Sequence, residues 1–344
     1  MRRSTSWTVF VPVAWAGFCL ASPWASRADN WPGWRGPTGV GRSAEKSLPL
    51  QWDGKSGENV LWKASLAGTT GHSSPIVWGD RVFLTTAAKQ TGEQEERKEV
   101  PKHHLVCYQA ADGKTLWRTP IPSGKQPAGY AIYAVPTPVT DGKVVYAWFG
   151  SAVMAAVDSG GKLLWRKERP GPFKLNPGIC SSPILYKDTV ILLCDQGRGE
   201  GFLQGLAKRT GEVKWQQKRE KVSYNNTTPL LIEVKGKPQM VIAGKYVYKA
   251  RRDEDIVCLD LATGRELYTA KLDGISKLAS PFATADGRVY FATAGKSYVI
   301  QAGPSLKVLA ANDLGGEMDG SSPAVSGGRA FIRGRKFLYC VGRR

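Results

Sequence analysis

The sequence predicts an all-β protein, a β-propeller built from four-stranded antiparallel blades. The first observation is a repeated unit, a proline-led strand followed by a tight turn and a second strand, which occurs six times. The second is a composition of 39 glycines, 21 prolines and 12 tryptophans, which suits many short strands joined by turns. The third is the scarcity of long apolar stripes with helical period, which argues against a helical bundle. Six units predict six blades, with seven and eight blades as the open alternatives.

Each repeated unit opens with a small residue and a proline, as in "SSPIVWGDRVFL". The prolines lie 42 to 63 residues apart, the range of propeller blades with insertions, and are Pro75, Pro138, Pro183, Pro229, Pro281 and Pro323. Proline has no N–H group, so it fits the start of a strand, where no ladder hydrogen bond is lost. The Gly-Asp, Asp-Gly or Gly-Gly pairs that follow in most units supply a tight hairpin. Each opening is therefore expected to form the first strand of a blade.

The second half of the unit is a strand, a glycine turn and a strand that closes on an aromatic residue. The closing aromatics are Trp117, Trp165, Trp215 and Tyr268. The turn glycines are Gly113, Gly161, Gly211 and Gly264, and we expect them to adopt a positive φ. Ligand stacking is the alternative role for the aromatic rings. Recurrence at one repeat position favours a structural role instead, with each ring docked in the seam between neighbouring blades.

The two ends of the chain are expected to share one blade. The last unit, residues 321–342, has enough chain for about three strands and no closing aromatic. The segment Asn59–Leu66 is a single strand with Trp62 at the docking position. An N-terminal strand that completes the last blade would close the propeller and remove an open sheet edge.

The first 28 residues have the pattern of a secretory signal peptide. Arg2 and Arg3 precede an apolar run over residues 7–21, and the small residues Ser26 and Ala28 follow around a cleavage point. An uncleaved anchor helix is the alternative, but the apolar run is short and contains proline. The expected organisation is a signal peptide over 1–28, an N-terminal extension over 29–58 and a propeller over 59–344. The protein is then exported, to the periplasm or the extracellular space.

The chain is strongly basic, with 48 Lys and Arg against 29 Asp and Glu and a formal net charge of +19. Such a charge favours anionic partners, although its even spread also fits a solvated surface. Export makes nucleic acid an unexpected partner. An anionic polymer of the cell envelope, or a protein, is the expected one, bound by a monomer.

The cysteines give no disulfide framework, because an odd number remains after signal cleavage. Three of them occupy equivalent apolar strand positions of the repeat and are expected in the core: Cys107, Cys258 and Cys340. A bond between Cys180 and Cys194 on neighbouring strands is an open alternative.

No motif for catalysis or metal binding stands out. The three histidines are His72, His103 and His104, and adjacent residues on a strand point to opposite faces, so the last two do not share an ion. The acidic run Asp253–Asp255 fits a solvated turn, and Glu93–Glu99 fits a solvated loop or a short helix. Asn225 and Asn226 match glycosylation acceptors, but the adjacent blade opening favours a structural role. We expect neither catalytic nor metal-binding residues.

The repeat resembles the pyrroloquinoline-quinone-like (PQQ-like) β-propeller family, in particular its secreted BamB-like members. That family's docking element, roughly Ala-x-Asp-x-x-Thr-Gly-Lys-x-x-Trp, is matched best by Leu259–Tyr268, with Asp260, Thr263 and Gly264 in place. The stretch Ala207–Trp215 keeps a threonine, a glycine and the tryptophan of the same element. The opening "WPGWRGPTGVG" is also similar to secreted members of this group.

The resemblance implies two functions. Quinoprotein alcohol dehydrogenases in the family use a catalytic Asp, a calcium ion on Glu, Asn and Asp oxygens, and a vicinal disulfide, whereas this chain has no Cys-Cys pair. BamB-type members are outer-membrane assembly factors. We therefore expect a non-catalytic exported scaffold without cofactor that binds its partner through loops. A PQQ-binding dehydrogenase with calcium is the alternative.

The chain also departs from its relatives, which usually have eight units. The gap is expected near Gly244–Asp255, where the second half of a unit arrives early. A seventh, degenerate blade could use the insertion Lys89–His104.

Overall fold

The computed structural model describes residues 30–89, 100–124, 133–169, 181–195, 199–222, 228–234, 237–241, 255–259, 266–274, 279–303, 305–316 and 321–343. These ranges contain 25 β-strands and no helix, as the all-β prediction requires. They accordingly hold no helix able to cross a membrane. The predictions for the signal peptide, the run Glu93–Glu99, Cys180, Asn225, Asn226 and Gly264 fall outside the described residues.

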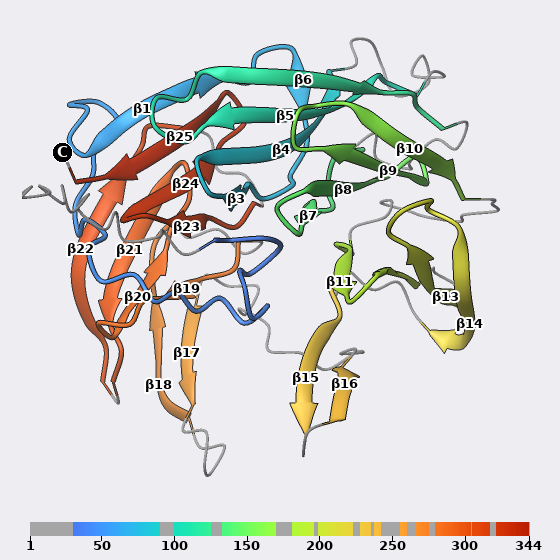
Figure 1. Cartoon of the computed structure of the whole chain (residues 1–344). Helices are drawn as coiled ribbons and strands as arrows, with labels where there is room; N and C mark the ends of the chain where they lie inside the picture. The colour runs from blue at the N-terminus through green and yellow to red at the C-terminus, as the bar shows by residue number, and fades with distance from the viewer. Residues whose placement is uncertain are drawn as a thin grey trace, which may run out of the picture.

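The strands form antiparallel sheets in chain order (Figure 1). The first unit's sheet contains β2 (Thr69–Thr70), β3 (Ile76–Trp78), β4 (Arg81–Ala88), β5 (His103–Gln109) and β6 (Thr115–Ile121). The second contains β7 (Val139–Thr140), β8 (Val144–Phe149), β9 (Val153–Asp158) and β10 (Leu163–Glu168). The third contains β11 (Ile184–Tyr186), β12 (Thr189–Asp195), β13 (Gly199–Ala207) and β14 (Val213–Val222).

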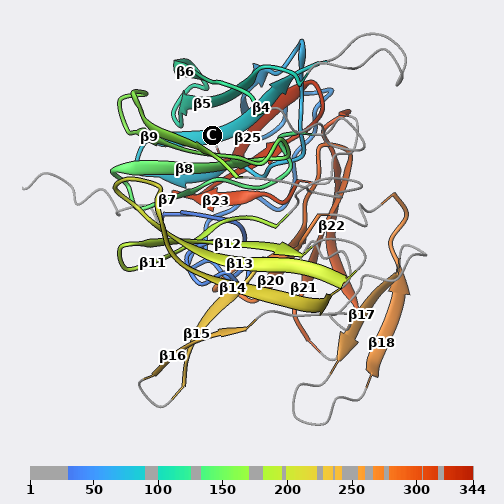
Figure 2. The ribbon, with the colours of Figure 1, turned by 90° about the vertical axis from the view of Figure 1, so that its right-hand side faces the viewer.

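The fourth unit forms two separate hairpins, which lie apart in Figure 2. They are β15 (Leu230–Val234) with β16 (Lys237–Val241), and β17 (Asp255–Leu259) with β18 (Glu266–Lys271). Within the described ranges β16 and β17 do not pair, whereas the second and third strands pair in every other unit. The fifth sheet contains β19 (Phe282–Ala283), β20 (Arg288–Phe291), β21 (Lys296–Gln301) and β22 (Lys307–Asp313).

The last sheet joins the two ends of the chain. β23 (Ala324–Ser326), β24 (Arg329–Arg333) and β25 (Phe337–Gly342) are followed in the sheet by β1 (Val60–Ser65), which lies beside β25 in Figure 1. The pairing is antiparallel and places Trp62 opposite Cys340. The predicted N-terminal strand is thus the fourth strand of the last sheet. The number of blades, six, and the closure of the ring remain predictions.

A β-bulge recurs in the fourth strand of all six units. In each case one residue is left out of the ladder directly before the docking position, and these residues are Leu61, Leu116, Leu164, Lys214, Leu267 and Leu309. A bulge bends the strand and changes the direction of the next side chain. The bulge therefore helps to aim the docking side chain at the neighbouring sheet.

Residues 30–58, the N-terminal strap, run across one face of the sheets. Trp31 pairs with Val77 of β3, Pro32 accepts a hydrogen bond from Thr140 of β7, and Arg42 bridges to Ala283 of β19. Further along, the Glu45 carboxylate accepts a hydrogen bond from Gly328 after β23 at 2.9 Å. The N-terminal extension is thus packed against the propeller, at the end where the first strand of each unit finishes.

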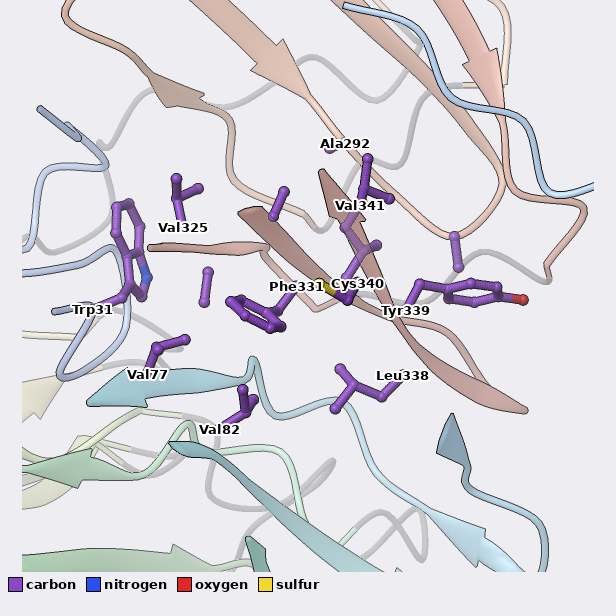
Figure 3. Close-up of a cluster of buried hydrophobic side chains, with 14 of the residues drawn as sticks. Trp31, Val77, Val82, Ala292, Val325, Phe331, Leu338, Tyr339, Cys340 and Val341 are labelled. Atoms are coloured by element: carbon purple, nitrogen blue, oxygen red, sulfur yellow. The ribbon is translucent and has the colours of Figure 1, made fainter. Parts of the chain in front are cut away.

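One core cluster packs the strap, the last sheet and the first sheet together (Figure 3). Trp31 from the strap, Val77 from β3 and Phe331 from β24 are each at most 2% exposed. Burial of side chains of this size contributes roughly 1.5–3 kcal/mol each. The strap and both ends of the chain therefore share one hydrophobic core.

Candidate functional site

Three docking tryptophans make the same contact in successive seams. The Trp62 indole Nε1 donates a hydrogen bond to the Ala110 carbonyl at 3.0 Å. Trp117 and Trp165 donate in the same way to Ser159, at 3.1 Å, and to Lys208, at 2.8 Å. Each acceptor lies in the glycine turn of the following unit. The three indoles thus join neighbouring sheets.

The turn glycines provide the space for these indoles. Gly113, Gly161 and Gly211 have φ of 77°, 96° and 70°, in the left-handed region. A Cβ atom on Gly113 would lie 2.4 Å from the Trp62 ring, and one on Gly211 would lie 2.6 Å from the Trp165 ring. Glycine is needed at these positions both for the backbone conformation and for the close approach of the ring.

Trp215 and Tyr268 differ from the other docking residues. Trp215 is 39% exposed and its ring lies against Gly205, opposite it on β13. Tyr268 is half-buried and packs toward Leu272 and Ile300.

The fifth unit has Ala310 where the others have an aromatic residue. In the last unit β25 is followed in the sheet by β1, from a distant part of the chain, and no glycine turn of the described residues joins these two strands. The strap occupies this seam instead, with Trp52 only 2% exposed and stacked on Tyr290 at 6.3 Å. Its backbone N–H donates to the Asn312 side chain at 3.0 Å.

A chain of hydroxyl groups links the starts of the first strands. The residue before each repeat proline is Ser or Thr, and these residues are Ser74, Thr137, Ser182, Thr228, Ser280 and Ser322. In five seams the backbone N–H of this residue donates a hydrogen bond to the hydroxyl of the equivalent residue in the next unit, at 2.8–3.0 Å. The five bonds run in the order Ser280, Ser322, Ser74, Thr137, Ser182 and Thr228. Between Thr228 and Ser280, both of them described, no such bond forms. The hydroxyl residue that recurs before each proline is a signal for these bonds that is visible in the sequence.

Arg333 adds a contact between the last and first units. Its guanidinium Nη1 donates to the Ser73 hydroxyl at 2.8 Å and to the carbonyls of Ser73 and Thr85 at 3.1 and 3.0 Å. The side chain is buried, with 3% of the residue exposed. Burial of a guanidinium is tolerated where such hydrogen bonds replace water. The arginine therefore fixes the seam where the chain ends meet.

A cavity of about 220 Å³, the axial pocket, lies between the strap and the first strands of the second to fourth units. Its lining is Pro32, Gly33, Trp34, Gly36, Pro37, Thr38, Gly39, Val139, Thr140, Pro183, Ile184, Leu185, Thr228, Pro229, Leu230 and Leu231. None of these residues is charged. The pocket can therefore accept an uncharged, largely apolar group, with threonine hydroxyls as its polar side chains.

A second cavity of about 440 Å³ lies where the strap meets β22. Asp53, Glu58 and Asp313 line it together with Lys296. No three His, Cys, Asp or Glu side chains of the described part of the chain come together in a metal-binding arrangement.

His103 and His104 differ in burial, as expected for adjacent residues of one strand: His103 is buried and His104 is half-buried. His103 is fully buried, stacks on Phe149 at 4.7 Å and shares a 2.6 Å hydrogen bond with the Ser151 hydroxyl. Burial, with a smaller effect of nearby positive charge, lowers the pKa of His103 to about 3. The His103 side chain is therefore neutral at physiological pH and a poor general base. Its hydrogen bond with Ser151 is structural.

The thiols are equally unreactive. Cys107, Cys194 and Cys340 are free and buried, and burial raises the pKa of each to about 12. A thiol of this kind is a small core residue and not a nucleophile.

The described residues do not fit a quinone cofactor with calcium. Calcium needs six to eight oxygen ligands in one place, and a carboxylated quinone needs cationic partners beside it. The axial pocket offers neither, and the carboxylates of the second cavity form no metal-binding group.

Comparisons with known proteins agree with this architecture. The family profile described as outer membrane protein assembly factor BamB matches residues 55–302, more than half of the chain. The BamB protein of Shewanella oneidensis is 26% identical over 176 residues, which cover 51% of this chain and 41% of that protein. The match thus spans less than half of the relative's length.

Two solved structures share the fold. A europium-containing methanol dehydrogenase superposes with a TM-score of 0.60 at 11% identity, covering 91% of this chain and 89% of that one. The quinohemoprotein alcohol dehydrogenase of Comamonas testosteroni superposes with a TM-score of 0.59 at 12% identity, covering 92% and 81%. At this identity the likeness shows a β-propeller fold and no shared activity.

Proposed function

The chain belongs to the family of the outer membrane protein assembly factor BamB, and on this premise we propose that it is a non-catalytic, exported propeller that binds a protein partner. The observation that carries the proposal is the chemistry of the described cavities. The axial pocket has no charged side chain, and the buried His103 and cysteines are unreactive. What the described residues build is a set of sheets joined by indole and hydroxyl hydrogen bonds.

The partner is proposed to bind at the face opposite the strap. The strap already covers the ends of β3, β7 and β19, so the loops at the other ends of the strands remain for a partner. Lys89, after β4, and Ser123, after β6, lie at that opposite end. The name of the Shewanella relative, an outer membrane assembly factor, supports a protein partner in the cell envelope.

Site-specific photocrosslinking in intact cells tests this proposal. The face opposite the strap is called the open face. A photoreactive residue is placed there at Lys89 or Ser123, and at Asp112 or Arg209, in turns on the strap side, as matched controls. A discrete adduct with an envelope protein is expected from the open face and not from the strap side. Absence of adducts at all four positions, with the protein exported and folded, would contradict the proposal.

An anionic envelope polymer is the second candidate partner, supported by the net charge of +19. Binding to such a polymer releases counterions and must weaken steeply as salt rises. Association with purified envelope polymer that is unchanged between about 50 and 200 mM salt would rule this candidate out.

A further inference from the structure

The strap covers the first strands of the units unequally. It forms backbone hydrogen bonds with β3, through Trp31, with β7, through Pro32, and with β19, through Gly41 and Ser43. The distances of these bonds are 2.8–2.9 Å. One extended segment therefore already docks along the open edges of three first strands.

β11 and β15, the first strands of the third and fourth units, receive no backbone hydrogen bond from the described strap residues, and neither does β23. β11 and β15 each stand at the end of their sheet and so present an edge. All three residues of β11 are half-buried, and so are Leu230 and Leu231, whereas the residues of β23 are fully buried. A strand at a sheet edge presents unpaired N–H and C=O groups.

The axial pocket lies beside these two strands, and Gly39 of the strap packs close to the Leu230 side chain at its rim. Ile184 and Leu185 of β11 and Leu230 and Leu231 of β15 line it, facing Trp34 and the glycines of the strap. The pocket therefore combines strand edges for backbone hydrogen bonds with an apolar cavity of about 220 Å³ for side chains.

We propose that the axial pocket binds an extended peptide segment of a partner protein, which adds as a strand along β11 or β15 and places small, uncharged apolar side chains in the cavity. The absence of charge among the lining residues of a +19 chain disfavours acidic peptides and anionic polymers. The strap shows that the neighbouring first strands accept an extended, glycine-rich segment by the same kind of bond. This inference rests on the proposed protein-binding role, and it adds a second contact on the strap side that does not depend on the open-face site.

Fluorescence anisotropy with the exported, mature chain tests the proposal. The probe is a terminally blocked, fluorescein-labelled short peptide of alternating valine and serine. We expect saturable binding that does not depend on salt, because no charged group lines the pocket. The same peptide with N-methylated backbone amides is expected to lose binding, because strand addition needs its N–H groups.

Substitutions that fill the axial pocket with a larger side chain test whether the peptide binds there. Leu185→Trp and Leu231→Trp each add a large ring to the lining and are expected to raise the Kd at least about tenfold. The matched control is Leu164→Trp, at an exposed bulge position outside the pocket, which is expected to leave the Kd unchanged. Thermal unfolding of each variant establishes that it is folded.

Failure of the inference is distinguishable from failure of the scaffold role. The inference is overturned by absence of saturable binding, by equal binding of the N-methylated peptide, or by an unchanged Kd in both folded pocket variants. Photocrosslinks from the open face would still support the scaffold in each of these cases. Peptide binding without any photocrosslink would support the pocket and remove the open-face partner.

Discussion

An indole over a glycine is the unit of contact between neighbouring sheets. In each of three seams one tryptophan packs on a left-handed glycine and donates its N–H to a turn carbonyl. The hydrogen bond satisfies the one polar atom of a large apolar ring, so the ring can be buried without an unpaired donor.

Trp165 and Trp215 form a matched pair for this contact. Trp165 is 9% exposed and bonded to Lys208, whereas Trp215 is 39% exposed. Trp165→Ala is expected to lower the free energy of unfolding by about 3–5 kcal/mol, and Trp215→Ala by clearly less. Chemical denaturation of both variants provides the measurement. Equal losses of unfolding free energy in the two variants would show that the exposed Trp215 stabilises the protein as much as the buried Trp165.

His103 predicts a pH dependence of stability. Its pKa of about 3 in the folded chain lies below the ordinary value of 6.5, because burial disfavours the imidazolium. The neutral side chain therefore contributes stability above about pH 6.5, and this contribution is lost as the pH falls toward about 3. The slope reaches about 1.4 kcal/mol per pH unit.

Denaturation midpoints of the parent and of His103→Gln, measured from about pH 7 to about pH 4, test this. The difference in stability between the two proteins is expected to shrink as the pH falls. His72→Gln, at a half-buried histidine, serves as the control. A difference that stays constant with pH would mean that His103 titrates normally.

The repeated bulge and glycine turn show how the elements place these residues. The bulge stands directly before the docking position in six strands, and in three seams a glycine turn of the next unit receives the ring. The two devices act together, since the bulge turns the ring and the glycine leaves room for it.

Alanine substitutions at Gly113 and Gly57 distinguish the cost of backbone strain from the cost of a steric clash with a neighbouring ring. Their φ angles are 77° and 76°, but a Cβ on Gly113 would meet the Trp62 ring at 2.4 Å and one on Gly57 would meet nothing within 4 Å. Gly57→Ala is expected to cost about 1 kcal/mol from backbone strain alone. Gly113→Ala is expected to cost at least about 2 kcal/mol more, because the ring must shift. Similar melting temperatures for the two variants would show that Trp62 does not dock tightly on the turn.

The sequence allowed these elements to be predicted because each leaves a residue-type signal. Proline marked the first strands, and the glycine turns and tryptophans marked the second halves of the units. The bulge was harder to predict, because the residue left out of the ladder is leucine in five units and Lys214 in the sixth, and leucine is also common at regular strand positions. The strap contacts were also invisible, because they join backbone groups of segments far apart in the chain. The axial pocket depends on those contacts and could not be foreseen.

At the scale of the whole molecule, the two chain ends hold the first and last sheets together. β1 completes the last sheet, Arg333 bonds to Ser73 and Thr85, and Ser322 bonds to Ser74. These contacts link residues from opposite ends of the sequence, so they form only after the whole chain is available.

Removal of residues 30–66 should therefore destabilise the entire protein. The deletion takes away the strap and β1, and it exposes the edge of β25 and part of the shared core. A large fall in melting temperature, with association through the exposed edge, is expected in calorimetry and sedimentation. A monomeric deletion variant that melts within a degree or two of the parent would contradict the role of the N-terminal strand.

We propose that this BamB-family propeller is a scaffold and not a quinoprotein. Isothermal titration of residues 29–344 with pyrroloquinoline quinone in the presence of calcium, and separately of a lanthanide, tests this proposal. We expect no saturable heat with either metal, because no charged side chain lines the axial pocket and the carboxylates of the second cavity form no metal-binding group among the described residues. Stoichiometric, saturable binding of the quinone would contradict it.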